Sequence, residues 1–411
     1  MKLDKKSYVD YMFGFIERVC KDIGSRPGTS ENESKAGQVI KVEYERFCDE
    51  VKVEPFTCRP GGFLGILNII PVLQLLAAGF YLWFTWVSVL LTVLGLLCYV
   101  LEMNHLREFA DPLFRKRTSA NIYGKIKAKG KAKATVIIGA HHDSPVEFPI
   151  PIKWRAKSSR FITIIIVVIG LIFAVYVAKI SGEYFNLFYM NWTLLGFRLF
   201  DLLILVPIIG VILTVALRLG LKSGTQTLGA NDNLSGVAVT LGVAEYLSGN
   251  RPRNTSVLLI SHGCEECMRG SKRFVDRHLR ELEKWNTYVI NFDTAGVGRF
   301  VIVNEEKMYT TKHSMELCKM LQHSASKCGI KYPVEIRPFS MGGTDSAFYS
   351  KKGIRATSVI GLARDGFPVV WHNREDTPKK LSSENLYDML KLAVQFIEDV
   401  DQRGADERKR E

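Results

Sequence analysis

The stretch ATVIIGAHHDS, residues 134–144, decides the fold. Residues 135–140 form an almost uninterrupted apolar run rich in β-branched side chains, which is typical of a strand buried on both faces of a parallel sheet. The polar residues His141, His142, Asp143 and Ser144 follow this run directly. Because α/β proteins place their sites at the carboxyl ends of parallel strands, the stretch predicts both a buried sheet and a site at its edge.

Other polar parts of the chain alternate between helical and strand-like patterns. Helices are expected over 5–22, 31–49, 235–248 and 270–282, and strands over 51–56, 119–126, 256–261 and 287–292. This alternation predicts an α/β fold with a mixed, mostly parallel sheet sandwiched by helices. The charged stretch 401–411 has no apolar face and is expected to be a frayed tail.

Two apolar stretches interrupt the alternation. About 42 uncharged residues separate Arg59 from Glu102, and they would be roughly 60 Å long as a helix, twice the hydrocarbon thickness of a bilayer. They predict a transmembrane hairpin that turns between Phe80 and Ser88. A second hairpin is predicted from the apolar segments 161–178 and 202–217, with 184–197 at the membrane interface; a fifth span there stays an alternative.

The predicted organisation is one catalytic domain split into three parts. These parts are 1–60, 103–160 and 219–400, separated by hairpins at 61–102 and 161–218 and followed by the charged tail 401–411. Four spans return every part to one side of the bilayer. Lys and Arg cluster at the domain-side flanks, so the positive-inside bias predicts a multi-pass protein of the cell membrane with a cytoplasmic catalytic domain.

The net charge of +13 fits orientation and phospholipid contact better than nucleic-acid binding. No basic residues interleave with aromatic ones, so no nucleic-acid partner is expected. Nothing in the sequence predicts an oligomeric state.

Ligand-type residues recur at other predicted strand ends. Strand 256–261 leads to Glu265 and Glu266, strand 287–292 to Asp293, and the apolar run 369–371, read as a strand, to His372; Asp232 precedes the helix that opens at 235. Two histidines and three carboxylates suit a pair of zinc ions that share a bridging carboxylate.

Neighbouring residues would complete such a site. Asp143 is expected to accept the ring N–H of His141, whereas His142 should point to the opposite face of its strand. Glu265 and Glu266 are adjacent, so one can bind a metal while the other takes a proton.

Six ordered motifs resemble those of the co-catalytic zinc aminopeptidase family. They are GAHHDS (139–144), GANDNLSG (229–236), HGCEECMRGSKRF (262–274), INFDTAG (290–296), GGTDSAF (342–348) and WHNREDT (371–377), and IGSRPGTSENESKA (23–36) resembles the family's entry turn. Relatives in that family include glutamate carboxypeptidases, glutaminyl cyclases and metal-free members such as the transferrin receptor. The resemblance does not extend to either hairpin.

The resemblance implies a membrane-embedded aminopeptidase that removes N-terminal residues from peptides. The implied ligands of two zinc ions per chain are His141, Asp232, Glu266, Asp293 and His372, with Asp232 bridging. His141 and Asp293 would complete one site, and Glu266 and His372 the other. Glu265 is implied to be the general base that activates a metal-bridging water. The resemblance also implies a cis Asp232–Asn233 peptide bond and supporting roles for Asp345 and Asp376.

Two other functions stay open. One is an acyl transferase resembling glutaminyl cyclase, whose members typically hold a single zinc. The other is a non-catalytic membrane scaffold resembling the family's metal-free members. Cys264 and Cys267 bracket the two glutamates; inert packing is the favoured interpretation, and redox sensitivity or a third metal are the alternatives.

Overall fold

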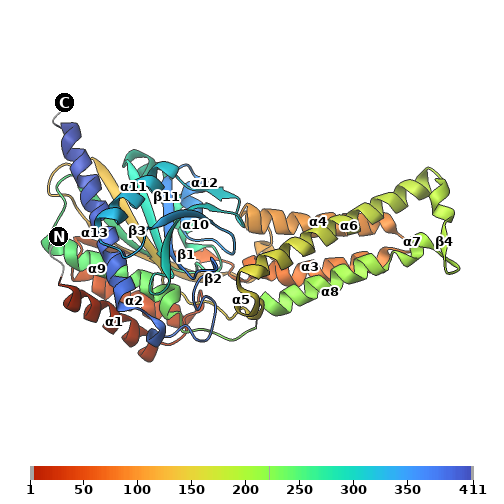
Figure 1. Cartoon of the computed structure of the whole chain (residues 1–411), viewed down its shortest axis with the longest axis horizontal. Coiled ribbons are helices and arrows are strands. Elements are labelled where there is room, and N and C mark those ends of the chain that lie inside the picture. The colour runs from red at the N-terminus through yellow and green to blue at the C-terminus, as the bar shows by residue number, and fades with distance from the viewer. Residues whose placement is uncertain (1–3, 222, 409–411) are drawn as a thin grey trace. The chain divides into compact units, whose positions relative to one another are not determined.

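The β-branched runs of the sequence form the middle of a nine-stranded sheet (Figure 1). Its central strands β3 (Ala134–His141), β6 (Thr255–His262) and β7 (Thr287–Asp293) are buried along their whole length, as expected of strands covered on both faces. The strand order is β1-β2-β6-β3-β7-β11-β8-β10, and β9 pairs with β8. The other strands are β1 (Glu50–Cys58), β2 (Arg117–Ile126), β8 (Arg299–Glu306), β9 (Thr311–Lys312), β10 (Glu335–Phe339) and β11 (Arg355–Leu362).

The four central strands run parallel, in the order β6, β3, β7 and β11. Antiparallel pairs flank them, where β2 meets β6 and β8 meets β11. The predicted fold class, a mixed and mostly parallel sheet between helices, is confirmed. Register places His141 opposite His262 and Asp293 opposite Ile360. The carboxyl ends of β3, β6 and β7 therefore meet at one edge of the sheet.

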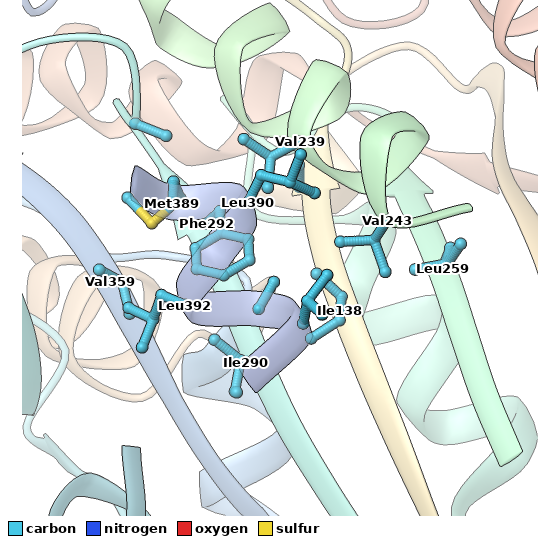
Figure 2. Packing of buried hydrophobic residues seen from close by; sticks show 14 of the residues in the cluster. Ile138, Val239, Val243, Leu259, Ile290, Phe292, Val359, Met389, Leu390 and Leu392 are labelled. Atoms are coloured by element: carbon cyan, nitrogen blue, oxygen red, sulfur yellow. The ribbon is translucent and has the colours of Figure 1, made fainter. Parts of the chain in front are cut away.

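Helices cover this sheet. They are α1 (Lys5–Asp22), α2 (Glu31–Glu45), α9 (Ser235–Gly249), α10 (Gly270–Lys284), α11 (Met315–Lys327), α12 (Ser346–Lys351) and α13 (Ser383–Arg408). Figure 2 shows Val239 and Val243 of α9 and Leu390 of α13 packed around Ile138 and Phe292 of the central strands, all of them fully buried. Full burial of each such side chain contributes about 1.5–3 kcal/mol. The helix α9, which begins three residues after Asp232, is thus held firmly against the sheet.

The computed structural model describes residues 4–221 and 223–408, with side chains as far as residue 403. The chain divides into two units. The sheet unit comprises residues 1–60, 115–147 and 224–411, and the helical unit comprises 61–114 and 148–223. The predicted six-part domain division stays a prediction.

In the part that the structure describes, the helical unit contains four longer apolar α-helices and two short ones. They are α3 (Gly61–Phe80), α4 (Thr85–Tyr99), α5 (Pro149–Trp154), α6 (Ser158–Tyr184), α7 (Leu199–Leu202) and α8 (Leu205–Leu221), with a two-stranded ribbon of β4 (Thr193–Leu194) and β5 (Phe197–Arg198) between α6 and α7. Polar side chains inside this unit bond to nearby carbonyl groups: the Ser88 hydroxyl donates to Ala77 O at 2.6 Å, and the Lys179 ammonium donates to Tyr81 O at 2.7 Å. The turn of the first hairpin falls within the predicted interval 80–88.

Among the described residues, four helical segments are long and apolar enough to cross a membrane. They are Gly61–Phe80, Thr85–Asn104, Pro149–Tyr184 and Leu199–Leu221. Their number matches the four predicted spans, and 185–198 is not among them.

Two local predictions were wrong. Residues 369–371 form a turn, not a strand, because only Pro368 bridges to Leu362 before the chain reverses. Residues 401–408 are not frayed but continue α13, and Asp401 anchors this end by accepting the backbone N–H groups of Arg253 and Asn254 at 3.0 and 2.5 Å. The rest of the predicted tail, 409–411, lies outside the described residues.

Candidate metal centre

His141 ends β3 with its side chain buried and its Nε2 atom facing carboxylates. That atom lies 3.2 Å from Asp232 Oδ1 and 3.7 Å from Glu265 Oε2. The other ring nitrogen, Nδ1, lies 3.2 Å from the backbone oxygen and 3.4 Å from the carboxylate of Asp143. A neutral ring that carries its proton on Nδ1 would donate it to Asp143 and would keep a lone pair on Nε2 for a ligand.

Asp232 is fixed by the polypeptide on either side of it. The carboxylate of Asp376 accepts the N–H groups of Asn231 and Asp232 at 2.6 and 3.0 Å. The Asn233 side chain donates to Phe292 O at 2.8 Å and accepts from Gly236 N at 3.1 Å, at the start of α9. The Asp232–Asn233 peptide bond is cis, as the resemblance implied. Asp376 therefore has the supporting place expected of it.

Glu265 and Glu266 lie in a turn that follows β6. The Asp143 carboxylate accepts the N–H of Glu265 at 3.0 Å and that of Glu266 at 3.1 Å. Asp143 thus joins the histidine at the end of one strand to the two glutamates that follow the next. A backbone anchored at two consecutive N–H groups restricts where the glutamate side chains can lie.

His372 approaches from the opposite end of the sequence. Its Nε2 atom lies 3.4 Å from Glu266 Oε2 and 3.9 Å from Asp232 Oδ2, and its Nδ1 atom lies 3.0 Å from Val146 O. Both histidines therefore use Nδ1 to bond a backbone carbonyl and present Nε2 to the carboxylates.

Three groups of donor atoms lie within 4.8 Å of one another among the described residues. One is His141, Asp232 and Asp293, and another is Asp232, Glu266 and His372; the third joins His141 to Glu265 and Glu266. The first two groups share Asp232 and contain all five predicted ligands. The structure thus brings the predicted ligands together from the ends of β3 and β7, the short helical segment Ala230–Leu234 and two turns.

The sequence model of Peptidase family M28 matches residues 215–397, which include Asp232, both glutamates, Asp293 and His372. This part of the chain is similar to peptidase family M28. His141 and Asp143 precede the matched segment.

The curated proteins that the chain resembles are distant in sequence. The "Vacuolar membrane protease" of Candida albicans, found in two strains, is 24% identical over 182 residues, which are 42% of this chain and 20% of that protein. This chain therefore matches about a fifth of the length of those relatives.

Solved structures share the fold of this chain. A zinc aminopeptidase of Bacillus subtilis superposes with a TM-score of 0.54 at 14% identity, covering 95% of each chain. A glutaminyl cyclase of Bacteroides thetaiotaomicron superposes with a TM-score of 0.55 at 14% identity, covering 97% of this chain and 98% of that chain. At such identities the likeness shows the fold, which is the zinc aminopeptidase fold that the motifs implied.

The buried atoms of the candidate centre fit a pair of divalent cations. Asp232 Oδ2 is buried and has no hydrogen-bond partner within the described part of the chain, although it faces His372 Nε2. A carboxylate oxygen in that position is costly unless a cation meets it. Imidazole nitrogen and carboxylate oxygen are the donors that zinc prefers.

The pKa values of the buried residues at the centre also favour a bound cation. Burial, reinforced by the charge of Asp232, raises the pKa of Asp293 to about 8. Burial and neighbouring carboxylates also raise the pKa values of Glu265 and Glu266. Burial opposes protonation of His141, but Glu265, Asp143 and Asp232 outweigh it and raise its pKa. A bound cation would replace the missing positive charge and favour the ionised carboxylates.

Other residues assigned from the sequence lie as follows. His142 points away from the site and bonds Ser261 Oγ through Nδ1 at 2.9 Å, and burial lowers its pKa to about 4, so its structural role is confirmed. Asp345 is fully buried, and burial raises its pKa to about 7. Its charge acts on Glu265 and Asp293, which agrees with a supporting position beside the site.

Sequence reasoning missed two buried residues that shape the site. The Arg26 guanidinium donates to His142 O at 2.9 Å, Leu228 O at 2.8 Å and Gly229 O at 3.1 Å, and so ties the His141 loop to the Asp232 loop. Glu33 accepts Cys264 N at 2.6 Å, next to the two glutamates. Arg26 and Glu33 both lie in the segment 23–36 quoted above. The only sequence feature that could have indicated their roles is that they are charged residues in a predicted turn and at a predicted helix start.

Proposed function

We propose that this protein is a membrane-embedded aminopeptidase with two zinc ions per chain. The observation that carries the proposal is the pair of three-donor groups that share Asp232. A shared carboxylate is what two zinc ions about 3.5–4 Å apart require. Each group supplies three donors, so a fourth coordination position would remain for water or substrate, as in catalytic rather than structural zinc sites. Zinc held there would polarise the scissile carbonyl group.

Glu265 is the proposed general base, and Glu266 the proposed ligand. Glu266 belongs to the group that contains Asp232 and His372, whereas Glu265 joins only the group that contains His141 and Glu266. The Glu265 side chain is nearly buried, and burial raises its pKa. A carboxylate in that position can take a proton from the attacking water and pass it to the leaving nitrogen.

Glu265→Gln tests this assignment. The variant keeps the shape of the side chain and its anchored backbone but loses the proton acceptor, so we expect turnover to fall about 10²–10⁴-fold while zinc content stays at the wild-type level. Release of N-terminal residues from a panel of aminoacyl reporters, measured on protein purified in detergent, gives the rate. The matched control is Glu335→Gln at an exposed position of β10, which should leave the rate unchanged.

A Glu265→Gln protein as active as the parent would exclude Glu265 as the base. A variant that loses zinc would instead make Glu265 a ligand and leave the base to be found elsewhere.

A glutaminyl-cyclase activity is the second candidate, because the bacterial glutaminyl cyclase superposes as well as the aminopeptidase does. The two activities differ in product: the cyclase closes an N-terminal glutamine with loss of ammonia, whereas the peptidase releases a free amino acid. Product analysis on a peptide that begins with glutamine separates them. The site contains two groups of metal-donor atoms that share Asp232. Two such groups favour the peptidase, for which two zinc ions are proposed, over the cyclase, which typically holds one.

Membrane embedding is proposed from the four apolar segments, and the peptide is the proposed substrate. Because four spans form two hairpins, the three polar parts of the chain would lie on one side of the bilayer. The flanking Lys and Arg residues favour the cytoplasmic side.

A further inference from the structure

Three cysteines meet behind the turn that carries Glu265 and Glu266. The Sγ atom of Cys58, at the end of β1, lies 3.8 Å from the Sγ atom of Cys264. Cys267 packs against the same cluster, together with Phe56. Cys58 and Cys264 are buried, whereas Cys267 is half-exposed. We call these three residues the thiol cluster.

The thiol cluster encloses the proposed base and one proposed ligand. The sequence Cys264-Glu265-Glu266-Cys267 places both glutamates between two cysteines, and Cys267 packs against the cluster that contains Cys264. The turn is closed by hydrogen bonds from Met268 N to Glu265 O at 2.5 Å and from Arg269 N to Cys264 O at 3.1 Å. These bonds close turns over 265–268 and 264–269, so Cys267 lies inside the turn that Cys264 opens. A disulfide joins residues whose Cα atoms lie about 4.4–6.8 Å apart.

Metal binding does not account for the thiol cluster. Among the described residues, the groups whose donor atoms all lie within 4.8 Å of one another are the three of the candidate metal centre, and the cysteine sulfurs are not one of them. Pairs of sulfurs in contact, with one thiol reachable from solvent, suit two-electron oxidation instead.

We propose that the thiol cluster is a redox modification site that controls this active-site turn. A peroxide oxidises the Cys267 thiol to a sulfenic acid and is itself reduced to an alcohol or to water. The Cys264 sulfur then attacks the Cys267 sulfur, the S–S bond forms, and the hydroxyl group leaves as water with the thiol proton. In total, two thiols and one hydroperoxide give one disulfide, one water and one alcohol, or a second water where the oxidant is hydrogen peroxide.

Cys267 reacts first because it is the cysteine of the cluster that solvent reaches. Cys264 is the resolving residue because its sulfur lies between the other two.

The bridge would displace the glutamates. Cys264 N is held by Glu33, and the next two N–H groups are held by Asp143. Drawing the sulfurs of Cys264 and Cys267 to about 2.05 Å changes the backbone between these anchors. Because a displacement of about 1 Å can cost about 10²-fold in rate, turnover should fall at least tenfold on oxidation and recover on reduction. This activity readout rests on the proposed peptidase function, whereas detection of the bridge does not.

The test uses the full chain in detergent, treated with hydrogen peroxide, alkylated and mapped by peptide mass spectrometry. Cys267→Ser and Cys58→Ser serve as a matched pair, since both replace a cluster thiol outside the proposed ligand set. Wild type and Cys58→Ser should form a Cys264–Cys267 bridge and lose activity, and dithiothreitol should reverse both changes. Cys267→Ser should form no bridge and keep its activity after the same treatment.

The proposal is overturned if wild type forms no bridge or forms only a Cys58–Cys264 bridge. It is equally overturned if peroxide inactivates Cys267→Ser as fast as the wild type. A protein with no peptidase activity would refute the proposed function, but peptide mapping would still decide whether the bridge forms.

Discussion

Asp143 links the two halves of the candidate centre through its backbone and its carboxylate. Its backbone oxygen orients His141, and its two carboxylate oxygens accept the N–H groups of Glu265 and Glu266. No other described carboxylate receives both of those N–H groups. Its contribution is therefore positional.

Replacing Asp143 by Asn should weaken the site without emptying it of ligands. The amide NH₂ group would face one of the two backbone N–H groups, so the turn would shift and metal affinity or turnover should fall about 10- to 100-fold. Competition with a chelator measures the affinity, and reporter hydrolysis measures the turnover. Asp276→Asn, at a half-exposed Asp–Lys pair, is the control and should change neither. Wild-type affinity and turnover in Asp143→Asn would remove Asp143 from the site.

Single residues differ in how far sequence could predict them. The five proposed ligands were predictable because each stands directly after an apolar run or just before a helix, and parallel strands bring such ends together. Arg26 and Glu33 were not, because their partners lie far along the chain: Arg26 bonds Gly229, and Glu33 bonds Cys264. Such contacts follow from loop conformation, which short-range patterns do not encode.

At the scale of elements, Glu54 of β1 and His278 of α10 join the edge of the sheet to the helix beside it. Their side chains lie 2.9 Å apart. Although burial acts to raise it, hydrogen bonds from His278 and Tyr123 lower the pKa of Glu54 to about 2. The hydrogen bond to Glu54 raises the pKa of His278 above 6.5.

This pair should stabilise the sheet unit most between about pH 5 and 6.5. A lowered carboxyl pKa gives stability that is lost as pH falls toward about 2, and a raised histidine pKa gives stability that is lost as pH rises through it. At pH 6 the pair should contribute on the order of 1 kcal/mol to the free energy of unfolding. The difference in Tm between wild type and His278→Gln should therefore be smaller at pH 9 than at pH 6. Lys352→Gln, which breaks a pair without histidine, is the control. An equal difference at both pH values would show that the pair does not stabilise the fold.

Helices and strands could be predicted where the hydrophobic pattern of the sequence was long and clear. The central strands and α9 follow from uninterrupted apolar runs, whereas the turn around His372 does not. Val369 and Val370 have high strand propensity, but Val370 has a φ of 52° and His372 a φ of 48°, so the chain reverses there. Tertiary contacts, among them the bond from His372 to Val146, outweigh local propensity.

At the scale of the whole molecule, the two-hairpin arrangement predicts a definite orientation. A tag after residue 411 and a tag inserted between Leu195 and Gly196, where Leu195 is 88% exposed, should lie on opposite sides of the bilayer. Protease digestion of sealed inside-out vesicles should remove the C-terminal tag and spare the inserted one. Permeabilised vesicles are the control, since both tags should then be lost. Removal of both tags from sealed vesicles would contradict the orientation.

The composition of the chain explains why its overall architecture could be predicted from the sequence. Uncharged helical segments stand apart from the charged α/β segments, so four spans and one sheet can be recognised separately. The structure assigns 61–114 and 148–223 to the helical unit, whereas the predicted division of the chain at 102 and 161 stays a prediction. Short helical and irregular segments beside the spans carry charge and resemble surface loops.

The central claim is that one carboxylate, Asp232, serves two metal sites. The direct test is the zinc content of the purified wild-type protein and of Asp232→Asn, measured by elemental analysis per mole of chain. We predict about two zinc ions in the wild type, as a bridging carboxylate requires, and loss of both in the variant. One zinc ion in the wild type, or a variant that keeps two, would contradict the claim.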